Sequence, residues 1–330
     1  MKAYSRPRLV AIGGGTGLST MLRGLKNENF DITSIVTVAD NGGGSGVLRQ
    51  ELGMLPPGDI RNCVQALANT PPAVADLLAY RYTDGSLKGQ SFGNLLLAAL
   101  NGMCTSFHEA VALMCEILSV TGRVLPVTDA NVQLCADFAD GASIRGECEI
   151  ADYKKSCGAS ILRATLEPAA PEALPECLDA IRRADLILLG PGSLYTSVIP
   201  NLLVRGIPEA IHESDALKLC ILNVMTQIGE TEGYAASDFV RALFQHGGEG
   251  LFDLALANSQ PIPPEQLSPY VAEGAEPLRV DEDAITSLGV QTFYAPVASW
   301  KTGPIRHDPD ALASAIARIY LDRSPTRVYR

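Results

Sequence analysis

Short apolar runs that stop at glycine recur along this chain and alternate with stretches of helical periodicity. The runs at residues 9–12 and 33–39 are aliphatic and β-branched, and each leads into a glycine-rich sequence. Residues 16–26 follow the first run and carry leucines at the three- and four-residue spacing of one helix face. The pattern predicts two consecutive strand–loop–helix units at the start of the chain.

The same alternation continues to the C-terminus. Further helices are predicted at residues 47–51, 60–68, 73–81, 92–103, 107–118, 176–183, 234–245 and 308–322. Further strands are predicted at residues 185–190, 217–224, 251–257 and 290–298, and residues 261–274 are expected to be irregular. Strands that alternate with helices are typical of an α/β protein with a doubly wound, mainly parallel sheet and helices on both faces.

The pattern changes at residue 122. Three short segments with alternating polarity follow, at residues 124–128, 132–137 and 142–150. They predict a small antiparallel β subdomain that is inserted into the α/β frame. We therefore divide the chain into a ligand-binding core, residues 1–121 and 176–330, and an insertion, residues 122–175, within one structural unit.

Three glycine-rich loops each follow a predicted strand, at residues 13–17, 41–46 and 190–193. Glycine lets the backbone turn tightly and lets a ligand come close. The amide groups at the start of the following helix favour an anion. Because parallel strands end at the same edge of a sheet, the loops predict a site for a phosphate-bearing ligand. The alternative is that each loop is only a tight strand–helix turn.

Composition narrows the function classes. The formal net charge is −11, which argues against non-specific binding to nucleic acid or to anionic membranes. No apolar run is long enough for a signal peptide or a membrane span. The eight cysteines form no Cys-x-x-Cys pair, and we interpret them as reduced thiols of a cytoplasmic protein.

The first loop only partly matches known nucleotide-binding motifs. Its glycines, with Asp40 at the end of the next strand, are similar to a dinucleotide fingerprint. However, Leu18 stands where the third glycine is required, and Asp40 leads into another glycine loop. The sequence also lacks the Gly-Lys-Ser/Thr of a Walker loop. A NAD-binding protein remains an alternative.

Several polar residues near the loops are candidates for ligand contacts. Asp40 could hold a ribose, a sugar hydroxyl or Mg²⁺, or it could form only a local turn. Asp59 could act with it, or could be the N-cap of the helix at 60–68. Arg49 and Arg61 could pair with phosphate or be solvated helix charges. Asn94, on an apolar helix, either caps that helix or points into the site.

We find no set of nucleophile, base and orienting group in the sequence. The histidines His108, His212, His246 and His307 have no metal-site spacing. His246 is expected near a helix C-terminus, where the helix dipole favours it. His307 stands at the start of the last helix and is a weaker candidate for a ligand contact.

Six motifs in order resemble the bacterial YvcK group of the CofD-like superfamily. They are GGGTGLS (13–19), VTVADNGGGSGVLR (36–49), PPGDIRN (56–62), FGNLLLAAL (92–100), GPGSLYTSVIPNLL (190–203) and NVMTQIGETEGY (223–234). The resemblance covers nearly the whole chain. It implies a Rossmann-like core with a six-stranded parallel sheet and an added β subdomain.

The resemblance also implies a function. The YvcK group is associated with binding of UDP-sugars, notably UDP-N-acetylglucosamine, with cell shape and with growth on gluconeogenic carbon sources. The superfamily also contains 2-phospho-L-lactate transferase, whose second loop carries Asp-Asp where this chain has Asp40-Asn41. That difference favours a regulator without an obligatory cofactor over a Mg²⁺-dependent transferase that would use Asp40 and Asp59. Asp238-Phe239 replaces an Asp-His pair of the family.

The loops and the resemblance together predict one set of ligand-binding residues. The set is Gly14, Gly15, Thr16, Asp40, Asn41, Gly42, Gly43, Arg49, Asp59, Asn62, Asn94, Gly190, Gly192, Ser193, Leu194, Thr196, Asn223, Thr226, Tyr270 and Arg306. The ligand would be a UDP-sugar, or NAD in the same groove. Whether the protein is a monomer or a homo-oligomer stays open.

Overall fold

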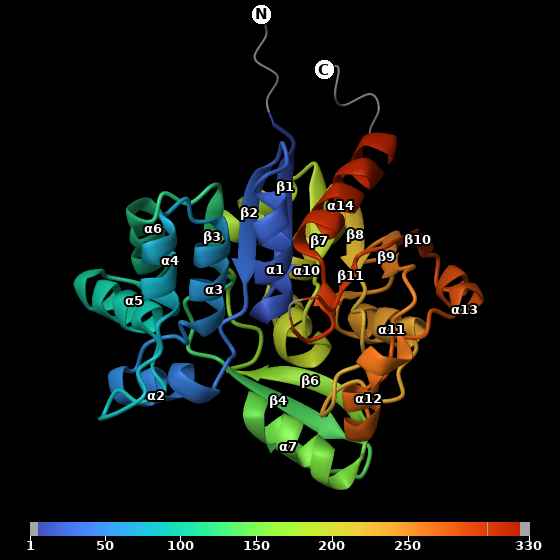
Figure 1. Cartoon of the computed structure of the whole chain (residues 1–330), viewed down its shortest axis with the longest axis horizontal. Helices are drawn as coiled ribbons and strands as arrows, with labels where there is room; N and C mark the ends of the chain where they lie inside the picture. The colour runs from blue at the N-terminus through green and yellow to red at the C-terminus, as the bar shows by residue number, and fades with distance from the viewer. Residues whose placement is uncertain (1–5, 302, 324–330) are drawn as a thin grey trace, which may run out of the picture.

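A parallel sheet runs through the centre of the molecule, in a computed structural model that describes residues 6–301 and 303–323 (Figure 1). Within those residues, seven strands lie in the order β10-β9-β8-β7-β1-β2-β3, and all neighbours are parallel. The bounds are β1 Arg8–Gly13, β2 Asp31–Val36, β3 Arg123–Pro126, β7 Leu186–Leu189, β8 Leu217–Ile221, β9 Leu254–Asn258 and β10 Gln291–Ala295. The predicted α/β fold with a doubly wound sheet is confirmed.

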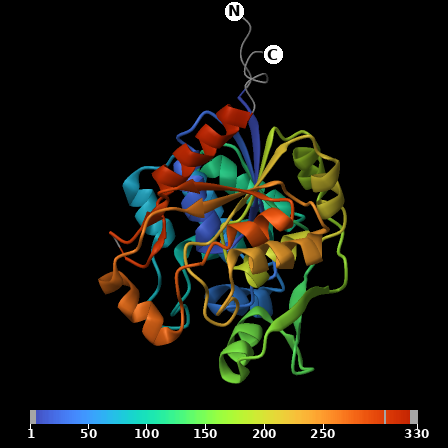
Figure 2. The same ribbon diagram turned by 90° about the vertical axis from the view of Figure 1, so that its right-hand side faces the viewer.

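Helices cover both faces of the sheet, as Figure 2 shows from the side. On one face, α1 packs against α3 and α14. The other face carries α8, α9, α10 and α11, and α13 packs against α11. The bounds are α1 Gly15–Leu25, α3 Gly58–Leu67, α8 Pro175–Arg182, α9 Ile199–Leu202, α10 Ile207–Glu213, α11 Ala236–Gly247, α13 Glu282–Ser287 and α14 Pro309–Arg323.

A group of four helices lies at the β3 end of the sheet, on the left in Figure 1. Here α5 contacts α2, α4 and α6, and α6 also contacts β3. The bounds are α2 Gly43–Leu52, α4 Pro72–Ala79, α5 Phe92–Met103 and α6 Phe107–Ile117. The prediction for α5 is correct to the residue, because Ser91 caps the helix by accepting the Asn94 amide.

Burial on both faces explains why the central strands are almost wholly apolar. All four residues of β7 are buried, as are five of the six in β1.

Close helix packing on top of the sheet depends on a small residue. A Cβ on Gly24 of α1 would lie 2.0 Å from the Pro309 carbonyl oxygen, so α14 can dock only against glycine. The C-terminal helix is thereby joined to the first helix of the chain.

The insertion holds a second sheet, below the parallel one in Figure 1. Among the described residues, β4 (Gln133–Phe138) pairs antiparallel with β5 (Ser143–Arg145) and with β6 (Ile161–Glu167). The helix α7 (Glu147–Cys157) packs against β4 and β5. An inserted antiparallel subdomain is therefore confirmed as part of the fold, although its division from the core at residues 122 and 175 stays a prediction.

Two predictions for this region were wrong. Residues 124–128 do not form an antiparallel strand, because β3 pairs in parallel with β2 and makes the sheet seven-stranded rather than six-stranded. Residues 142–150 are not one strand, because the chain turns at Gly146, at a φ of +100°, and continues as α7. The apolar alternation there was too short to separate a strand from the first turn of a helix.

Two more corrections concern helices. The proline-rich stretch at 261–274 is not irregular throughout, since it contains α12 (Pro264–Glu273), which starts with proline at its first turn. Asp59 is not an N-cap, because α3 begins at Gly58 after Pro57 and no side chain caps it. The carboxylate of Asp59 is thus available for another role.

Strand order places a switch point between β1 and β7. The chain builds outward from β1 through β2 to β3, and then from β7 through β8 and β9 to β10 on the other side. The loops that follow β1 and β7 therefore diverge and leave a crevice at the carboxyl edge, where open α/β sheets bind ligands. No helix in the described part of the chain is long and apolar enough to cross a membrane.

Candidate functional site

A cavity of about 380 Å³ opens at this switch point. It is lined by parts of the loops after β1, β7 and β8, by α12, and by the segment before α14. Eight of the predicted ligand-binding residues line it: Gly15, Thr16, Gly192, Ser193, Asn223, Thr226, Tyr270 and Arg306. His307, the weaker candidate from the sequence, also lines the cavity, as does Gly17 of the first loop. The sequence did not predict ligand contacts for other lining residues such as Thr20, Ser197, Met225 and Gln227.

The first and third glycine loops are in direct contact. A Cβ on Gly17 would lie 2.7 Å from the Pro191 carbonyl oxygen, and one on Gly192 would lie 3.2 Å from the Gly14 carbonyl oxygen. Gly15 has a φ of +68°, a conformation that favours glycine. These glycines therefore bring two backbone loops together at the floor of the cavity.

The amide end of α1 faces this floor, and one of its amides, that of Gly15, is accepted by the Asp59 carboxylate. Gly14 is the N-cap and supplies no side-chain cap, and the first turn contains no acidic residue. The first amides of an α-helix have no partner within the helix, and the helix dipole makes that end attractive to anions. Gly15 and Thr16, which line the cavity, belong to this turn.

The loop after β8 is bonded to the loop after β7. The Asn223 side chain accepts the Gly192 amide at 3.2 Å and donates to the Gly192 carbonyl at 2.8 Å. The Ser193 hydroxyl donates to Oε1 of Gln227 at 2.7 Å. Because Asn223 forms both bonds with one residue, it fixes the orientation of the third glycine loop.

The far wall of the cavity comes from the last third of the chain. Thr226 exchanges two bonds with Glu276, through its amide at 2.7 Å and its hydroxyl at 2.9 Å. The Tyr270 hydroxyl accepts the Ile305 amide at 2.7 Å, which joins α12 to the strand β12 (Arg306–His307). β12 pairs antiparallel with β11 (Ala298–Ser299). Arg306 is exposed beside this junction.

The side chains that line the cavity include one arginine, Arg306, and no carboxylate among the described residues. His307 also lines it and is buried, and burial lowers the pKa of its imidazole to about 4, so the ring is neutral at pH 7. The amide end of α1 and Arg306 together suit a phosphate group.

The second glycine loop takes no part in lining this cavity. The Asn41 side chain bonds to the insertion, donating to Glu149 at 2.7 Å and accepting the Cys148 amide at 3.0 Å. The Arg49 guanidinium donates to Oδ1 of Asn131 at 2.6 Å and also to the Val132 carbonyl. These two predicted ligand contacts are thus occupied by the subdomain, which they attach to the core.

Asp40 forms the local turn that was its alternative role. Its Oδ1 accepts the Gly42 amide at 2.7 Å, one residue before α2 begins at Gly43. The same carboxylate is hydrogen-bonded to Glu147 at the start of α7. The α2 end resembles that of α1, since Gly42 is its N-cap and no side chain caps it.

Three carboxyl groups gather beside the first loop. Burial, and then the charge of Asp40, raises the pKa of Asp59 to about 7. Burial and Asp40 also raise the pKa of Glu147 strongly. Asp59 accepts the Gly15 amide, and its Oδ2 would be 2.6 Å from a Cβ on Gly14, so Gly14 makes room for it.

These carboxyls do not form a ready metal site. Within residues 6–301 and 303–323, no three His, Cys, Asp or Glu side chains are arranged so that they could hold a metal ion. Because Asp59 keeps a proton on a large fraction of molecules at neutral pH, it can both donate and accept hydrogen bonds. That chemistry suits the hydroxyl groups of a sugar.

The remaining predicted residues have structural partners. The Thr196 hydroxyl donates to Glu230 at 2.7 Å, and the Leu194 amide bonds to the same carboxyl group. Burial raises the pKa of Glu230 to about 7. Its carboxyl group accepts hydrogen bonds from the start of the short π-helix Leu194–Val198. Gly190 turns the chain at a φ of +78° just before the third loop.

Arg61 and Asn94 bond to each other between α3 and α5. The Arg61 Nε donates to Oδ1 of Asn94 at 3.1 Å, and Nη1 donates to Gln65 at 2.9 Å. Asn94 therefore neither caps α5 nor lines the cavity, whereas Asn62 lies partly buried on α3.

The sequence analysis missed Glu147 because it predicted a strand at that position. It also missed Glu230, although the polar loop before α11 offered a signal.

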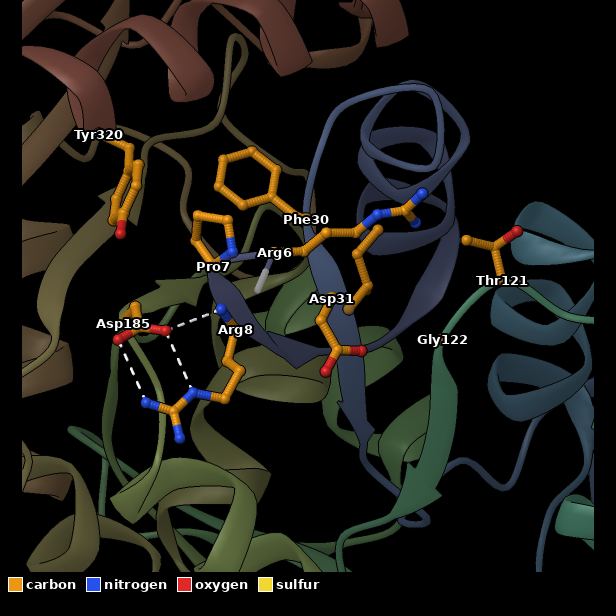
Figure 3. A pocket seen from close by; sticks show the side chains of 10 residues that line it. Arg6, Pro7, Arg8, Phe30, Asp31, Thr121, Gly122, Asp185 and Tyr320 are labelled. Atoms are coloured by element: carbon orange, nitrogen blue, oxygen red, sulfur yellow. Dashed lines mark hydrogen bonds and ion pairs between the residues drawn. The ribbon is translucent and has the colours of Figure 1, made fainter. Parts of the chain in front are cut away.

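A larger cavity lies at the opposite edge of the sheet, with a volume of about 620 Å³ (Figure 3). Its main polar feature is Arg8, which bonds to Asp185 through its amide and its guanidinium at 2.9–3.3 Å. Figure 3 shows Asp31 on the neighbouring strand and the ring of Tyr320 on the far side. Arg8 is already paired with a carboxylate, although Arg6 also lines the cavity, and no strand–helix turn is among the residues that line it.

The histidines other than His307 have structural roles. His108 Nδ1 pairs with Asp129, and His212 bonds to the Gly247 carbonyl at 2.9 Å. His246 accepts the Ala164 amide at 2.9 Å, which fastens α11 to β6, and its other nitrogen bonds to the Ala242 carbonyl. The expected position of His246 near a helix C-terminus is confirmed.

Comparison with known proteins places this chain in a family. The model of the family described as 2-phospho-L-lactate transferase CofD matches residues 9–298. The chain belongs to the CofD family. It is 46% identical over 312 residues to the gluconeogenesis factor of Bacillus subtilis, a match that covers 94% of this chain and 97% of that protein. The gluconeogenesis factor of Listeria monocytogenes is 40% identical over 317 residues, 96% of each chain.

Solved structures agree with this assignment to the CofD family. A crystal structure of a Bacillus halodurans protein superposes with a TM-score of 0.91 at 44% identity, over 94% of this chain and 99% of that one. A second structure from that organism, described as a member of the UPF0052 family, also has a TM-score of 0.91, at 43% identity. The resemblance inferred from the six motifs is confirmed at the level of family and fold.

Proposed function

We propose that this protein is a cytoplasmic regulator that binds a nucleotide sugar, with UDP-N-acetylglucosamine as its ligand, and that links carbon metabolism to cell-wall synthesis and cell shape. The observation that carries the proposal is the cavity at the switch point. It combines two touching glycine loops, the amide end of α1 and one arginine, without a lining carboxylate among the described residues. A diphosphate matches that combination.

The carboxyl groups beside the first loop support a sugar at one end of the ligand. Asp59 accepts the Gly15 amide, and Gly15 also lines the cavity. A diphosphate bound at the end of α1 would therefore lie beside Gly15, the residue to which Asp59 is bonded. Carboxyl groups that share protons with their neighbours suit sugar hydroxyls, which both donate and accept hydrogen bonds.

Tyr270 and Arg306 supply the opposite wall and suit the nucleotide. Tyr270 offers an aromatic ring whose hydroxyl is already held by the Ile305 amide, and Arg306 offers a planar cation at the rim. An aromatic ring can stack on a base, and a guanidinium can bind phosphate through two parallel bonds. The names of the relatives, gluconeogenesis factors, support the metabolic part of the proposal.

The test is ligand binding by calorimetry and thermal shift with UDP-N-acetylglucosamine, UDP-glucose, NAD and free UDP. At a hundredfold excess over Kd, a ligand that binds only the folded state stabilises it by about 2.7 kcal/mol. Arg306→Ala is expected to weaken binding by at least tenfold, because it removes a charge-assisted bond of about 1.5–3 kcal/mol. Arg318→Ala, an exposed arginine on α14, is the matched control. Absence of any shift with UDP-sugars would contradict the proposal.

A second candidate is a transferase of the 2-phospho-L-lactate type, and the family description and the carboxyl group cluster favour it. In that case Asp40 and Asp59 would orient the acceptor alcohol. The carboxyl arrangement does not fit a bound Mg²⁺ as it stands, so we derive no step through the metal. Transfer of the phospholactyl group from a nucleotide-activated phospholactate to the alcohol of a deazaflavin, with release of the nucleoside monophosphate and loss of the activity in Asp59→Asn, would favour this candidate over the regulator.

A further inference from the structure

His307 carries a buried nitrogen atom that has no partner in the described part of the chain. The residue belongs to β12, its side chain is buried, and it lines the cavity at the switch point. Its Nε2 atom forms no hydrogen bond with any of residues 6–301 and 303–323. Because nearly all buried polar atoms in proteins are hydrogen-bonded, this atom requires an explanation.

The other nitrogen of the ring determines what Nε2 can do. The imidazole is neutral at pH 7, because burial lowers its pKa to about 4. The ring donates to the backbone carbonyl of Leu222, just after β8, and this bond comes from Nδ1 because Nε2 has no partner. A neutral imidazole has a single N–H group, so Nε2 carries a free lone pair and can only accept a hydrogen bond.

The backbone holds this ring in place from several sides. His307 pairs with Ala298 of β11, and the Asp308 amide donates to the Val297 carbonyl at 2.7 Å. The strand β12 also contacts α1, whose Thr20 lines the same cavity. The position of Nε2 is therefore fixed before a ligand binds, as a residue that selects between ligands requires.

We propose that His307 determines ligand specificity, because its Nε2 accepts a hydrogen bond from a donor of the nucleoside, either a ribose hydroxyl or the imide N–H of the base. This inference rests on the proposed function, since it requires a nucleotide in the cavity. His307 follows Arg306 in β12, and Tyr270 is bonded to the residue before them. These residues form the wall to which we assign the nucleotide.

The lone pair of Nε2 discriminates between ligand groups. It repels a phosphate oxygen, so His307 does not add to the phosphate site formed by α1 and Arg306. It suits the N3–H of uracil, whereas cytosine has an acceptor at that position. A ligand without the donor leaves a buried acceptor unsatisfied, and sites that are built to hydrogen-bond a ligand group strongly reject analogues that lack it.

The test compares UDP with three analogues that each lack one donor, namely 2′-deoxy-UDP, 3′-deoxy-UDP and CDP. In calorimetry on the wild-type protein, one of the three should bind at least about tenfold more weakly than UDP. His307→Phe keeps a flat ring without the acceptor. This variant should bind UDP about tenfold more weakly than wild type does, and should bind that one analogue with no further loss.

Two more variants separate the acceptor from a structural role. His307→Gln can donate to the Leu222 carbonyl and still offer its amide oxygen as an acceptor, so it should recover part of the affinity lost in His307→Phe. His108→Phe is the matched control, because His108 lies on α6 and is not among the described residues that line the cavity. It should bind UDP as wild type does. Inorganic pyrophosphate, which lacks both donors, should bind to wild type and to His307→Phe equally.

The outcomes distinguish this inference from the proposed function. Failure of UDP to bind to the wild-type protein would contradict both. UDP binding that His307→Phe leaves unchanged would overturn the inference alone, as would weaker binding of pyrophosphate to that variant, because the ring would then act on phosphate. The analogue series on wild type remains decisive if His307→Phe folds poorly, since equal affinity for UDP and all three analogues also overturns the inference.

Discussion

The buried carboxyl of Asp59 should make the protein less stable as the pH rises, and Asp59→Asn should remove that effect. The folded protein holds the pKa of Asp59 at about 7, compared with an ordinary value of 3.8. Burial is the larger cause, and the nearby charge of Asp40 is the second. Asparagine keeps the shape and the acceptor for the Gly15 amide but has no charge to bury.

The magnitude follows from linkage. A carboxyl group whose pKa is raised by folding contributes stability below its unfolded value, and this contribution is lost as the pH rises through the folded value. The loss grows by ~1.4 kcal/mol per pH unit within that window. Between pH 5 and pH 8 the free energy of unfolding of Asp59→Asn, relative to wild type, should therefore rise by roughly 2–3 kcal/mol. Glu147 acts in the same direction, because it loses a charged neighbour.

The assay is urea unfolding of both proteins at pH 5, 6, 7 and 8. The difference between the two proteins cancels every titrating group that the substitution does not touch, including His307. Asp310→Asn is the matched control, since Asp310 is exposed in the first turn of α14. Its difference from wild type should stay constant over this pH range. If the Asp59→Asn curve runs parallel to wild type, the carboxyl is ionised in the folded protein and our account of the site is wrong.

Three other changes test the fold and the site. Gly24→Ala should destabilise the protein by about 2 kcal/mol or more in urea unfolding, because its Cβ would lie 2.0 Å from the Pro309 carbonyl oxygen. Asn223→Ala should lower the melting temperature slightly and the affinity for UDP-N-acetylglucosamine clearly in calorimetry, because two bonds to Gly192 are lost. Burial lowers the pKa of His307 to about 4, so the wild-type protein loses stability on acidification because the unfolded chain takes up the proton first. In His307→Gln, the loss in free energy of unfolding between pH 6.5 and pH 4, measured by urea unfolding, should be smaller by up to ~3 kcal/mol.

The sequence was a good guide to elements that local physics determines. The strands β1 and β7 are apolar runs bounded by glycine, and α5 has a serine cap and an apolar face, so their positions could be predicted closely. The touching loops at Gly14 and Gly192 were also anticipated as neighbours, because strands that are parallel must end at one edge.

The sequence was a poor guide where contacts between residues far apart in the chain determine the structure. Nothing near Arg49 or Asn41 indicates that each would bond to the insertion rather than to a ligand. The pairing of β3 with β2 likewise depends on tertiary contacts, because the pattern of a four-residue strand is too short to predict its partner. The charge state of Asp59 depends on burial by residues from several elements, which no local pattern encodes.

The cavity joins two segments that lie far apart in the sequence, and this has a consequence for folding during synthesis. It needs both the loop after β1 and the strand β12. In the described residues α14 follows β12 and docks against Gly24 of α1. A nascent chain on the ribosome therefore cannot assemble the whole pocket before β12 and α14 have emerged. Ligand capture thus becomes a reporter of molecules that contain both segments, and molecules terminated before β12 should be unable to sense the ligand.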